Sequence, residues 1–261
     1  MKPSHFVAVF FCEYGNFAAC YKDAWVKYLR FILLVMLFLE VMALHAQYGK
    51  LYNIVRSDSM PDRNNMSRIE RYLFDMDDEI MVEGSMYLDD EFKPGILILK
   101  NGLIFRDLFF RYNAFDDKMQ MIQGVDTLSL VKPEEVKFLK ISNRTFVYDD
   151  FSKSDSVQPS YFQLLSDGNY KLLVRHFIVF RFSNPFYLDM HIGDECDRFI
   201  KMNAYYVQEG SLPAIRIRKS IKSLQSAFPQ NKDRIRQICN ERGLNVRKEA
   251  DLIHLFEMLN K

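Results

Sequence analysis

The chain has 261 residues, with 35 Lys and Arg against 34 Asp and Glu and a formal net charge of +1. This balance argues against a general nucleic-acid binder, which needs surplus cations to displace phosphate counterions. Hydrophobic residues make up 49% of the sequence, which is enough for a real core and excludes global disorder.

The amino-terminal part carries the pattern of a cleavable export signal. Two cations precede the apolar run 31–39, and small residues follow it. Cations, an apolar stretch and a small-residue cut site occur in this order in signal peptides. We therefore predict a signal peptide over 27–46, cut between Ala46 and Gln47. The product would be an exported protein of the periplasm or outer membrane.

A retained membrane anchor is the alternative interpretation of the same segment. Glu40 interrupts the apolar run, and 31–44 is shorter than the ~18–20 residues that cross a bilayer. A charge at the centre of a spanning helix is also unfavourable. We therefore expect no stable membrane span after cleavage.

The residues 1–26 lie upstream of the cations, where a signal peptide would normally begin. We expect this segment to be a misassigned upstream extension, with translation starting at Val26 through an alternative start codon. The processed chain would then keep two cysteines, Cys196 and Cys239. In an oxidising compartment these could pair, or both could be buried as small apolar residues.

The stretch 47–75 is polar and irregular, with a short helix predicted at 67–74. From 76 to 212, short apolar runs alternate with turn residues, and Asn101-Gly102 is a strong hairpin signal. The gaps between the runs are too short for the crossovers that parallel strands need. The pattern predicts an antiparallel meander sheet, curved into a sandwich- or barrel-like form.

After residue 212 the apolar spacing becomes helical, so the predicted class is mainly β with C-terminal α. We predict three short packed helices over 213–261. Gly243 is expected to end the second helix in a left-handed conformation, and Asn245 to cap the third. The basic stretch 215–219 is interpreted as the solvated edge of a helix rather than a membrane-binding stripe.

Several short strings stand out along the chain, among them GSMYLDDEF at 84–92, FRYN at 110–113, LSDG at 165–168 and DRFI at 197–200. These strings resemble a broad set of uncharacterised secreted proteins from Bacteroidota. The resemblance spans most of the processed chain and implies export. It carries over no activity, because that group has no established function or site residues.

No phosphate-binding glycine loop, nucleophile elbow, zinc-binding helix or dinucleotide fingerprint is present in the sequence. We therefore predict a non-enzymatic binding or scaffolding module that needs no cofactor. Its partner would be an envelope protein or glycan. The alternative is a periplasmic hydrolase-type enzyme with a dispersed carboxylate site, for which the candidates are Asp89, Glu91 and Asp117.

Two segments supply the candidate binding residues. Arg111 and Tyr112 could hold an anion beside an aromatic face, or Arg111 could simply cover the sheet. The stretch 174–186 is more apolar than one sheet face needs, and its candidate contacts are Phe177, Phe180 and Phe182.

A third segment carries the candidate metal ligands His191, Asp194 and Cys196. Imidazole, carboxylate and thiolate all bind transition metals. The competing interpretation of this segment is a solvated turn.

Overall fold

The computed structural model describes residues 30–42, 51, 54–57, 82–154, 156–182 and 196–261. The chain divides into two compact units, Met1–Asn53 and Ile54–Lys261. In the first unit, residues 30–42 form a helix whose side chains are exposed. No helix in the described part of the chain is long and apolar enough to cross a membrane. The helix predicted at 67–74 and the cut site at Ala46 and Gln47 lie outside the described residues.

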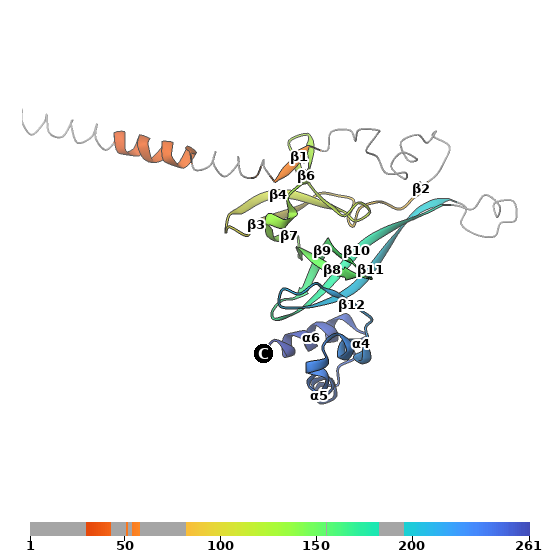
Figure 1. Cartoon of the computed structure of the whole chain (residues 1–261). Helices are drawn as coiled ribbons and strands as arrows, with labels where there is room; N and C mark the ends of the chain where they lie inside the picture. Colours follow the sequence, from red (N-terminus) through yellow and green to blue (C-terminus); the bar gives the residue numbers. More distant parts are fainter. Residues whose placement is uncertain (1–29, 43–50, 52–53, 58–81, 155, 183–195) are drawn as a thin grey trace, which may run out of the picture. The chain divides into compact units, whose positions relative to one another are not determined.

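The second unit is built on one large sheet (Figure 1). Its strands are β1 (Val55–Ser57), β2 (Val82–Glu83), β3 (Lys93–Leu99), β4 (Ile104–Asn113), β5 (Lys118–Gln123), β6 (Asp126–Leu130), β7 (Val136–Ile141), β8 (Arg144–Lys153), β9 (Ser156–Ser166), β10 (Tyr170–Arg181), β11 (Asp197–Glu209) and β12 (Ile215–Ile217). Helices lie mostly at the carboxyl end of the chain. The prediction of a mainly β protein with C-terminal α structure is therefore confirmed.

The sheet differs from the predicted antiparallel meander in how its strands pair. Its order is β1-β6-β5-β4-β3-β7-β8-β9-β10-β11-β12, so β7 returns to pair with β3 instead of following β6. The sheet is also mixed, because β2 pairs in parallel with the start of β11. These two strands are distant in sequence, so no local pattern could reveal their contact.

Gly84 follows β2 at the point where the chain approaches β11. Its φ is +83°, and a Cβ atom there would lie 2.6 Å from the carbonyl oxygen of Phe199. Only glycine fits both the left-handed backbone and this close approach. Gly84 therefore serves a long-range strand contact.

The predicted barrel- or sandwich-like form is wrong, since the strands belong to a single sheet that does not close. An isolated bridge joins Phe151 to Ala214 and brings the end of β8 beside the residue before β12. Between these strands lies a core of buried residues: Val147, Phe151, Phe162, Leu173, Ala204, Tyr206 and Ala214.

The carboxyl-terminal region contains α4 (Ile221–Ala227), α5 (Lys232–Arg242) and α6 (Glu249–Leu259), with a short 3₁₀ turn at Pro229–Asn231 between α4 and α5. Another 3₁₀ turn, Pro133–Glu135, lies between β6 and β7. Ser220 caps α4 by accepting a hydrogen bond from the backbone N–H of Ser223. Gly243 ends α5 at φ 62°, as predicted. Asn245 does not cap α6, which begins four residues later, after Lys248.

The basic stretch 215–219 was predicted to be the edge of a helix, and this is wrong. Ile215–Ile217 form β12, which pairs antiparallel with β11 through Val207 and Tyr205. Ile215 and Ile217 are β-branched, and β-branched residues favour strands. Their pairing with β11 outweighs the helical spacing of apolar residues that continues from this stretch into α4.

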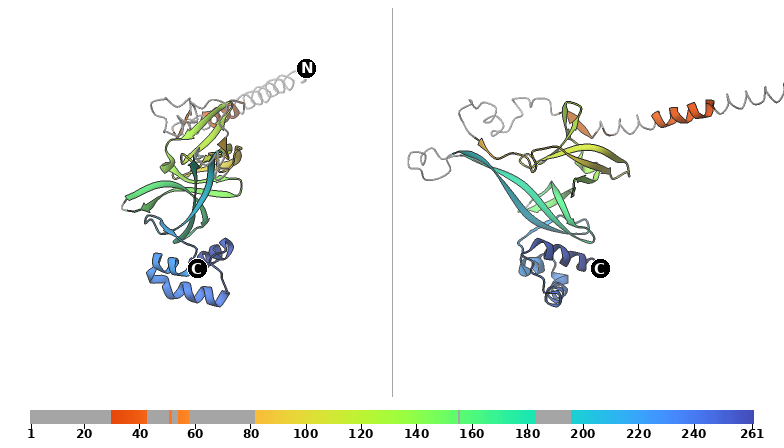
Figure 2. Two further views of the ribbon diagram at one scale, coloured as in Figure 1. Left: turned by 90° about the vertical axis from the view of Figure 1, so that its right-hand side faces the viewer. Right: turned by 180° about the vertical axis from the view of Figure 1, so that it is seen from behind.

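The helices and the last strands share one core. α4 contacts β12, and α6 contacts β9 and β10 (Figure 2). The side chain of Asn260 accepts a hydrogen bond from the backbone N–H of Tyr170 and donates to the carbonyl oxygens of Asp167 and Tyr170. Gly168 lies against this amide, where a Cβ atom would be 2.4 Å from the nearest side-chain atom. The end of α6 is thereby fastened to the β9–β10 turn.

Candidate functional site

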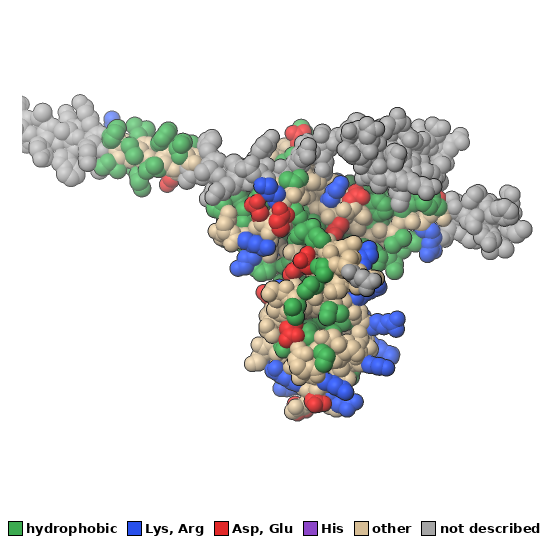
Figure 3. All heavy atoms as spheres, in the orientation of Figure 1, with side chains coloured by type: hydrophobic (Ala, Val, Ile, Leu, Met, Phe, Trp, Pro, Cys, Tyr) green, Lys and Arg blue, Asp and Glu red, His purple; other side chains and the backbone are tan. Residues whose placement is uncertain are grey.

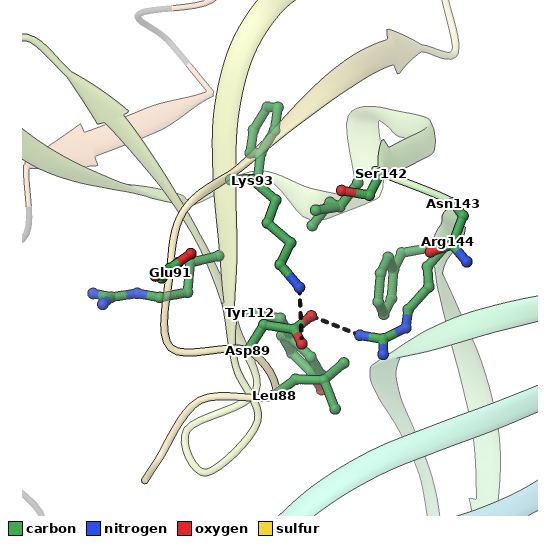
Figure 4. Close-up of a pocket in the computed structure, with 12 residues that line it drawn as sticks. Leu88, Asp89, Glu91, Lys93, Tyr112, Ser142, Asn143 and Arg144 are labelled. Atoms are coloured by element: carbon green, nitrogen blue, oxygen red, sulfur yellow. Dashed lines mark hydrogen bonds and ion pairs between the residues drawn. The ribbon is translucent and has the colours of Figure 1, made fainter.

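A small hollow of about 50 Å³ lies between the loop before β3 and the turn between β7 and β8. Asp89 projects into it and accepts a hydrogen bond from Arg144 at 2.7 Å (Figure 4). Lys93 pairs with the other carboxylate oxygen at 3.1 Å. The hollow is therefore centred on a carboxylate between two cations.

The pKa of Asp89 reflects this pairing. Burial alone would raise it, but the Lys93 hydrogen bond and the Arg144 charge outweigh burial and hold it below its usual value. Asp89 is therefore ionised at neutral pH and has no proton to donate as a general acid. Its lone pairs are directed at Lys93 and Arg144, which makes it a weak general base.

The three carboxylates of the hydrolase alternative do not share one pocket. Glu91 lines the same hollow, but its carboxylate lies apart from Asp89 on the other side of the loop (Figure 4). Asp117 is not among the residues lining the hollow. It lies beyond Tyr112, whose hydroxyl donates to it at 2.6 Å.

The guanidinium group of Arg111 contacts other residues of the protein. The group stacks on the rings of Tyr87 and Phe92, 3.6 and 4.4 Å from their centroids. It also donates to the side-chain oxygen of Gln120 and to the carbonyl oxygen of Asp90. These contacts fasten the loop before β3 onto β4, which is the role of an arginine that covers the sheet.

Tyr112 belongs to the interior, with 3% of its surface exposed. Burial, followed by the neighbouring Asp117 charge, raises the pKa of its hydroxyl well above the usual value. The hydroxyl therefore remains a hydrogen-bond donor at any physiological pH.

Asp117 is the centre of a polar network between the β4–β5 turn and strands β9 and β10. Its φ of 56° is left-handed, which aspartate tolerates better than most residues. The carboxylate accepts hydrogen bonds from Tyr112, from the hydroxyl of Ser160 at 2.6 Å and from the backbone N–H of Tyr161. Arg175 donates to the Ser160 oxygen and lies 3.9 Å from the carboxylate. This network fixes the β4–β5 turn against the rest of the sheet.

Sequence reasoning missed Ser160, Arg175 and His176. The ring nitrogens of His176 lie 2.7 and 2.8 Å from the side-chain oxygens of Asn203 and Gln163. Its partners lie 13 or more residues away in the chain. No spacing in the sequence signals contacts of this kind.

The aromatic candidates lie on a two-stranded arm, which we define as 175–181 of β10 together with 198–204 of β11. The pairing between β9 and β10 ends at Val174, whereas β10 and β11 stay paired to Arg181 and Arg198. The arm therefore extends beyond the rest of the sheet as a ribbon (Figure 2). Alternate residues face opposite sides of it.

The inner face of the arm contacts the β4–β5 turn. Phe180, which is 8% exposed, packs on Phe199, which in turn packs on Phe115. The backbone N–H of Ile178 donates to the carbonyl oxygen of Ala114. Phe182 stacks on Phe180 and is 50% exposed.

The outer face of the arm carries exposed apolar side chains between Arg175 at its base and Arg181 and Arg198 at its end. Phe177 lies opposite Met202, and Val179 lies opposite Ile200. Val179 and Met202 are each 45% exposed, whereas Phe177 packs partly against the core.

Of the predicted metal ligands, only Cys196 falls in the described part of the chain; His191 and Asp194 lie outside it. Within the ranges described, no three His, Cys, Asp or Glu side chains form a metal-binding group. Cys196 and Cys239 are both free thiols, and Cys239 is buried in the helical core.

Comparisons with protein-family models, with curated proteins and with solved structures found no match to this chain.

Proposed function

We propose that this chain is an exported cell-envelope protein that acts by non-enzymatic binding, with the outer face of the arm as its contact surface. The observation that carries the proposal is the apolar pair Val179 and Met202, each 45% exposed on a ribbon that extends beyond the sheet.

Both faces of the arm carry apolar side chains, although one face alone would be enough to hold it. On the outer face these side chains lie between Arg175 and the pair Arg181 and Arg198. The inner face already packs through Phe180 and Phe199 against the β4–β5 turn. An antiparallel hairpin with one packed face normally carries polar residues on the other. Contiguous exposed apolar side chains in such a place typically mark an interaction site.

The carboxylates support binding over catalysis. Asp89 is neutralised by Lys93 and Arg144, and Asp117 is engaged by hydrogen bonds from the protein itself. A hydrolase would need two such groups aimed at one substrate-sized cavity, and the hollow around Asp89 is too small for that.

The proposed partner is an envelope protein or glycan, and the proposed export rests on the signal-like segment 27–46. A protein surface with its own apolar patch suits Val179 and Met202. For a glycan partner, the residue available to stack on a sugar ring is Phe182, which is 50% exposed, follows the arm and packs on Phe180 of its inner face.

The experiment is site-specific photo-crosslinking in envelope preparations of the native host. A photoreactive residue replaces Val179 or Met202, and the control replaces Val125, a valine on the β5–β6 turn that is 97% exposed. We expect one discrete crosslinked species from both arm positions and none from the control. The double variant Val179→Ser, Met202→Ser should weaken partner capture by about tenfold or more, since hot-spot truncations commonly exceed 1 kcal/mol. Identical crosslinking from all three positions would overturn the proposal.

A further inference from the structure

The sheet is hollowed on its solvent-facing side where β3, β4 and β7 lie next to one another. An open hollow of about 380 Å³ lies there, and this volume is in the range of pockets that bind small ligands. We call it the bulge hollow. The side chains that line it are those of Pro94, Ile96, Arg106, Asp107, Lys140 and Ser142.

A β-bulge in β4 shapes this hollow. The register of β3 with β4 shifts between Gly95 and Leu97. Two residues of β4, Arg106 and Asp107, therefore lie opposite the single residue Ile96. Asp107 has a φ of 57°, a left-handed conformation that is uncommon outside glycine. Bulges of this kind redirect side chains and are frequent beside functional sites.

The strand register places the base and both sides of the hollow on one face of the sheet. Ile96 pairs with Lys140 of β7 on one side and lies opposite the bulge on the other. The neighbouring Leu97 is 0% exposed, so the buried face is the opposite one. The backbone N–H of Ser142 donates to the carbonyl oxygen of Pro94 and holds the β7–β8 turn beside the hollow.

A row of apolar side chains continues from the hollow across the same face. Pro94 pairs with Phe109, and Phe109 pairs with Ile122 of β5. Residues that lie directly opposite each other on neighbouring strands share a face and are in reach of one another. Pro94 is exposed, Phe109 is 46% exposed and Ile122 is half-buried. The hollow therefore adjoins an apolar surface that is open to solvent.

The charged side chains around the hollow also face solvent. Arg106, Asp107 and Lys140 are exposed. Among the residues that the structure describes, none donates or accepts a side-chain hydrogen bond or forms an ion pair with these three groups or with the hydroxyl of Ser142. Two cations against one carboxylate give the hollow a net positive charge, which attracts an anion. In the space-filling view, basic, acidic and hydrophobic side chains lie close together over the part of the second unit that holds β3, β4 and β7 (Figure 3).

We propose that the bulge hollow binds a short polypeptide segment in which a carboxylate stands next to an apolar side chain. Arg106 and Lys140 bind the carboxylate from opposite sides of Ile96, and the apolar side chain covers Ile96 and Pro94. The carboxylate of Asp107 and the hydroxyl of Ser142 accept hydrogen bonds from backbone N–H groups of the segment. The row that begins at Pro94 contacts the apolar residue that follows in the segment.

An acidic polysaccharide fits this surface less well. It would satisfy both cations but would present hydroxyl groups to the aliphatic base of the hollow, where they find no partner. None of the described residues that line the hollow is aromatic, so a sugar ring has no face to stack on there. A peptide with adjacent acidic and apolar residues satisfies the cations and the aliphatic side chains together.

This inference goes beyond the proposed function and uses a different surface. The arm is formed by 175–181 and 198–204, and none of the residues that line the bulge hollow belongs to it. The arm variant Val179→Ser, Met202→Ser should therefore keep full peptide binding at the hollow. A failure of one proposal leaves the other standing, because each is tested by variants of its own surface.

The test is a selection of phage-displayed random heptapeptides on the immobilised full chain. The library is counter-selected on the variant Arg106→Glu with Lys140→Glu. This step removes peptides that bind elsewhere, including those that bind the exposed apolar helix at 30–42, because the variant carries that helix too. We expect the enriched peptides to carry Asp or Glu adjacent to Leu, Ile, Val or Phe. The most enriched peptide is then synthesised, and fluorescence anisotropy measures its Kd.

Matched variants sharpen the measurement. Arg106→Glu with Lys140→Glu should weaken binding of the synthetic peptide by at least about tenfold, because repulsion replaces attraction at two positions. Ile96→Thr keeps a β-branched residue in the strand and should weaken binding by about fivefold, through lost apolar contact. The control, Lys232→Glu with Arg236→Glu, reverses one Lys and one Arg at exposed positions on α5 and should stay within about twofold. Thermal melting checks that each variant is folded.

Three results would overturn the proposal. The first is a selection that enriches no peptide able to distinguish the wild-type chain from the charge-reversed variant. The second is a selected peptide that binds equally well after its carboxylate is replaced by the matching amide. The third is full displacement of the peptide by polygalacturonate at equal carboxylate concentration, which would identify a general polyanion site.

Discussion

The two halves of β10 have similar apolar character but opposite surroundings. In the first half, Leu172 and Leu173 are fully buried between β9 and β11. In the second half, Val179 is 45% exposed on the outer face of the arm. The difference arises because β9 pairs with β10 only as far as Val174. Burial along this strand is therefore decided by its neighbours, not by its residue types.

The packed half and the arm also differ in what holds them. The packed half lies in a core closed by Phe162, Tyr206 and Ala214. Beyond Phe177, which packs partly against that core, the arm packs through its inner face, where Phe180, Phe199 and Phe115 are in contact. Substitutions in the first region should change folding, and substitutions on the outer face of the second should change binding.

The largest expected effect comes from Leu173→Ala. Leu173 is 0% exposed, and a buried Leu→Ala change lowers the free energy of unfolding by about 2–5 kcal/mol because it leaves a cavity. The matched change on the same strand, Val179→Ala, should stay within about 0.5 kcal/mol. Urea denaturation measures both. Equal losses would mean that the arm is packed on both faces.

The next effect concerns Asp117, which ties the β4–β5 turn to the packed half. Asp117→Asn removes the negative charge beside Arg175. The hydroxyls of Tyr112 and Ser160 donate to different oxygens of this carboxylate, and the amide of asparagine keeps only one of the two acceptors. We expect a loss of about 1–3 kcal/mol, the penalty for leaving a buried donor unsatisfied. The control is Asp126→Asn, at the exposed first residue of β6. If both variants melt at the wild-type temperature, the network does not stabilise the turn.

The smallest expected effect is a pH dependence of the free energy of unfolding. It arises from His176, which lies where the packed half of β10 meets the arm. Burial lowers the pKa of this imidazole below its usual 6.5, against the opposing effect of the Asn203 hydrogen bond. The unfolded chain therefore takes up the proton first as the pH falls. The contribution of His176 to stability is fully present above pH 6.5 and is lost as the pH falls from there through the lowered pKa.

His176→Gln should flatten the stability profile in that window, and His254→Gln, at an exposed position on α6, should leave it unchanged. Chemical denaturation at a series of pH values from neutral to mildly acidic measures both profiles. A wild-type slope that persists in His176→Gln would assign the effect to other groups.

The hairpins were predictable because their signals are local. The side chain of Asn101 accepts a hydrogen bond from the backbone N–H of Leu103, and Gly102 has a φ of 88°. These contacts lie within a few residues, so Asn101-Gly102 predicts the β3–β4 hairpin without reference to the rest of the chain. The stop at Gly243 was predictable for the same reason.

The candidate site was predicted only in its separate parts. Arg111, Tyr112 and the aromatic residues of 174–186 were identified from the sequence. The sequence did not predict that Arg111 stacks on Tyr87 and Phe92, or that Phe180 is buried. Both contacts depend on segments that are distant in the chain. The basic stretch 215–219 was identified from the sequence but assigned to a helix, because the pairing of Ile215 with Val207 cannot be predicted from the local sequence.

The sequence by itself therefore determined the fold class, the hairpin turn at Asn101-Gly102 and the end of α5 at Gly243. Each follows from the preferences of nearby residues. The tertiary structure alone decided the parallel contact of β2 with β11, the return of β7 to β3, the strand at Ile215–Ile217 and the exposure of one face of the arm. Each of these depends on segments that are far apart in the chain and meet only when the whole sheet has formed. A strand's partners, rather than its own residues, settle which of its faces is covered.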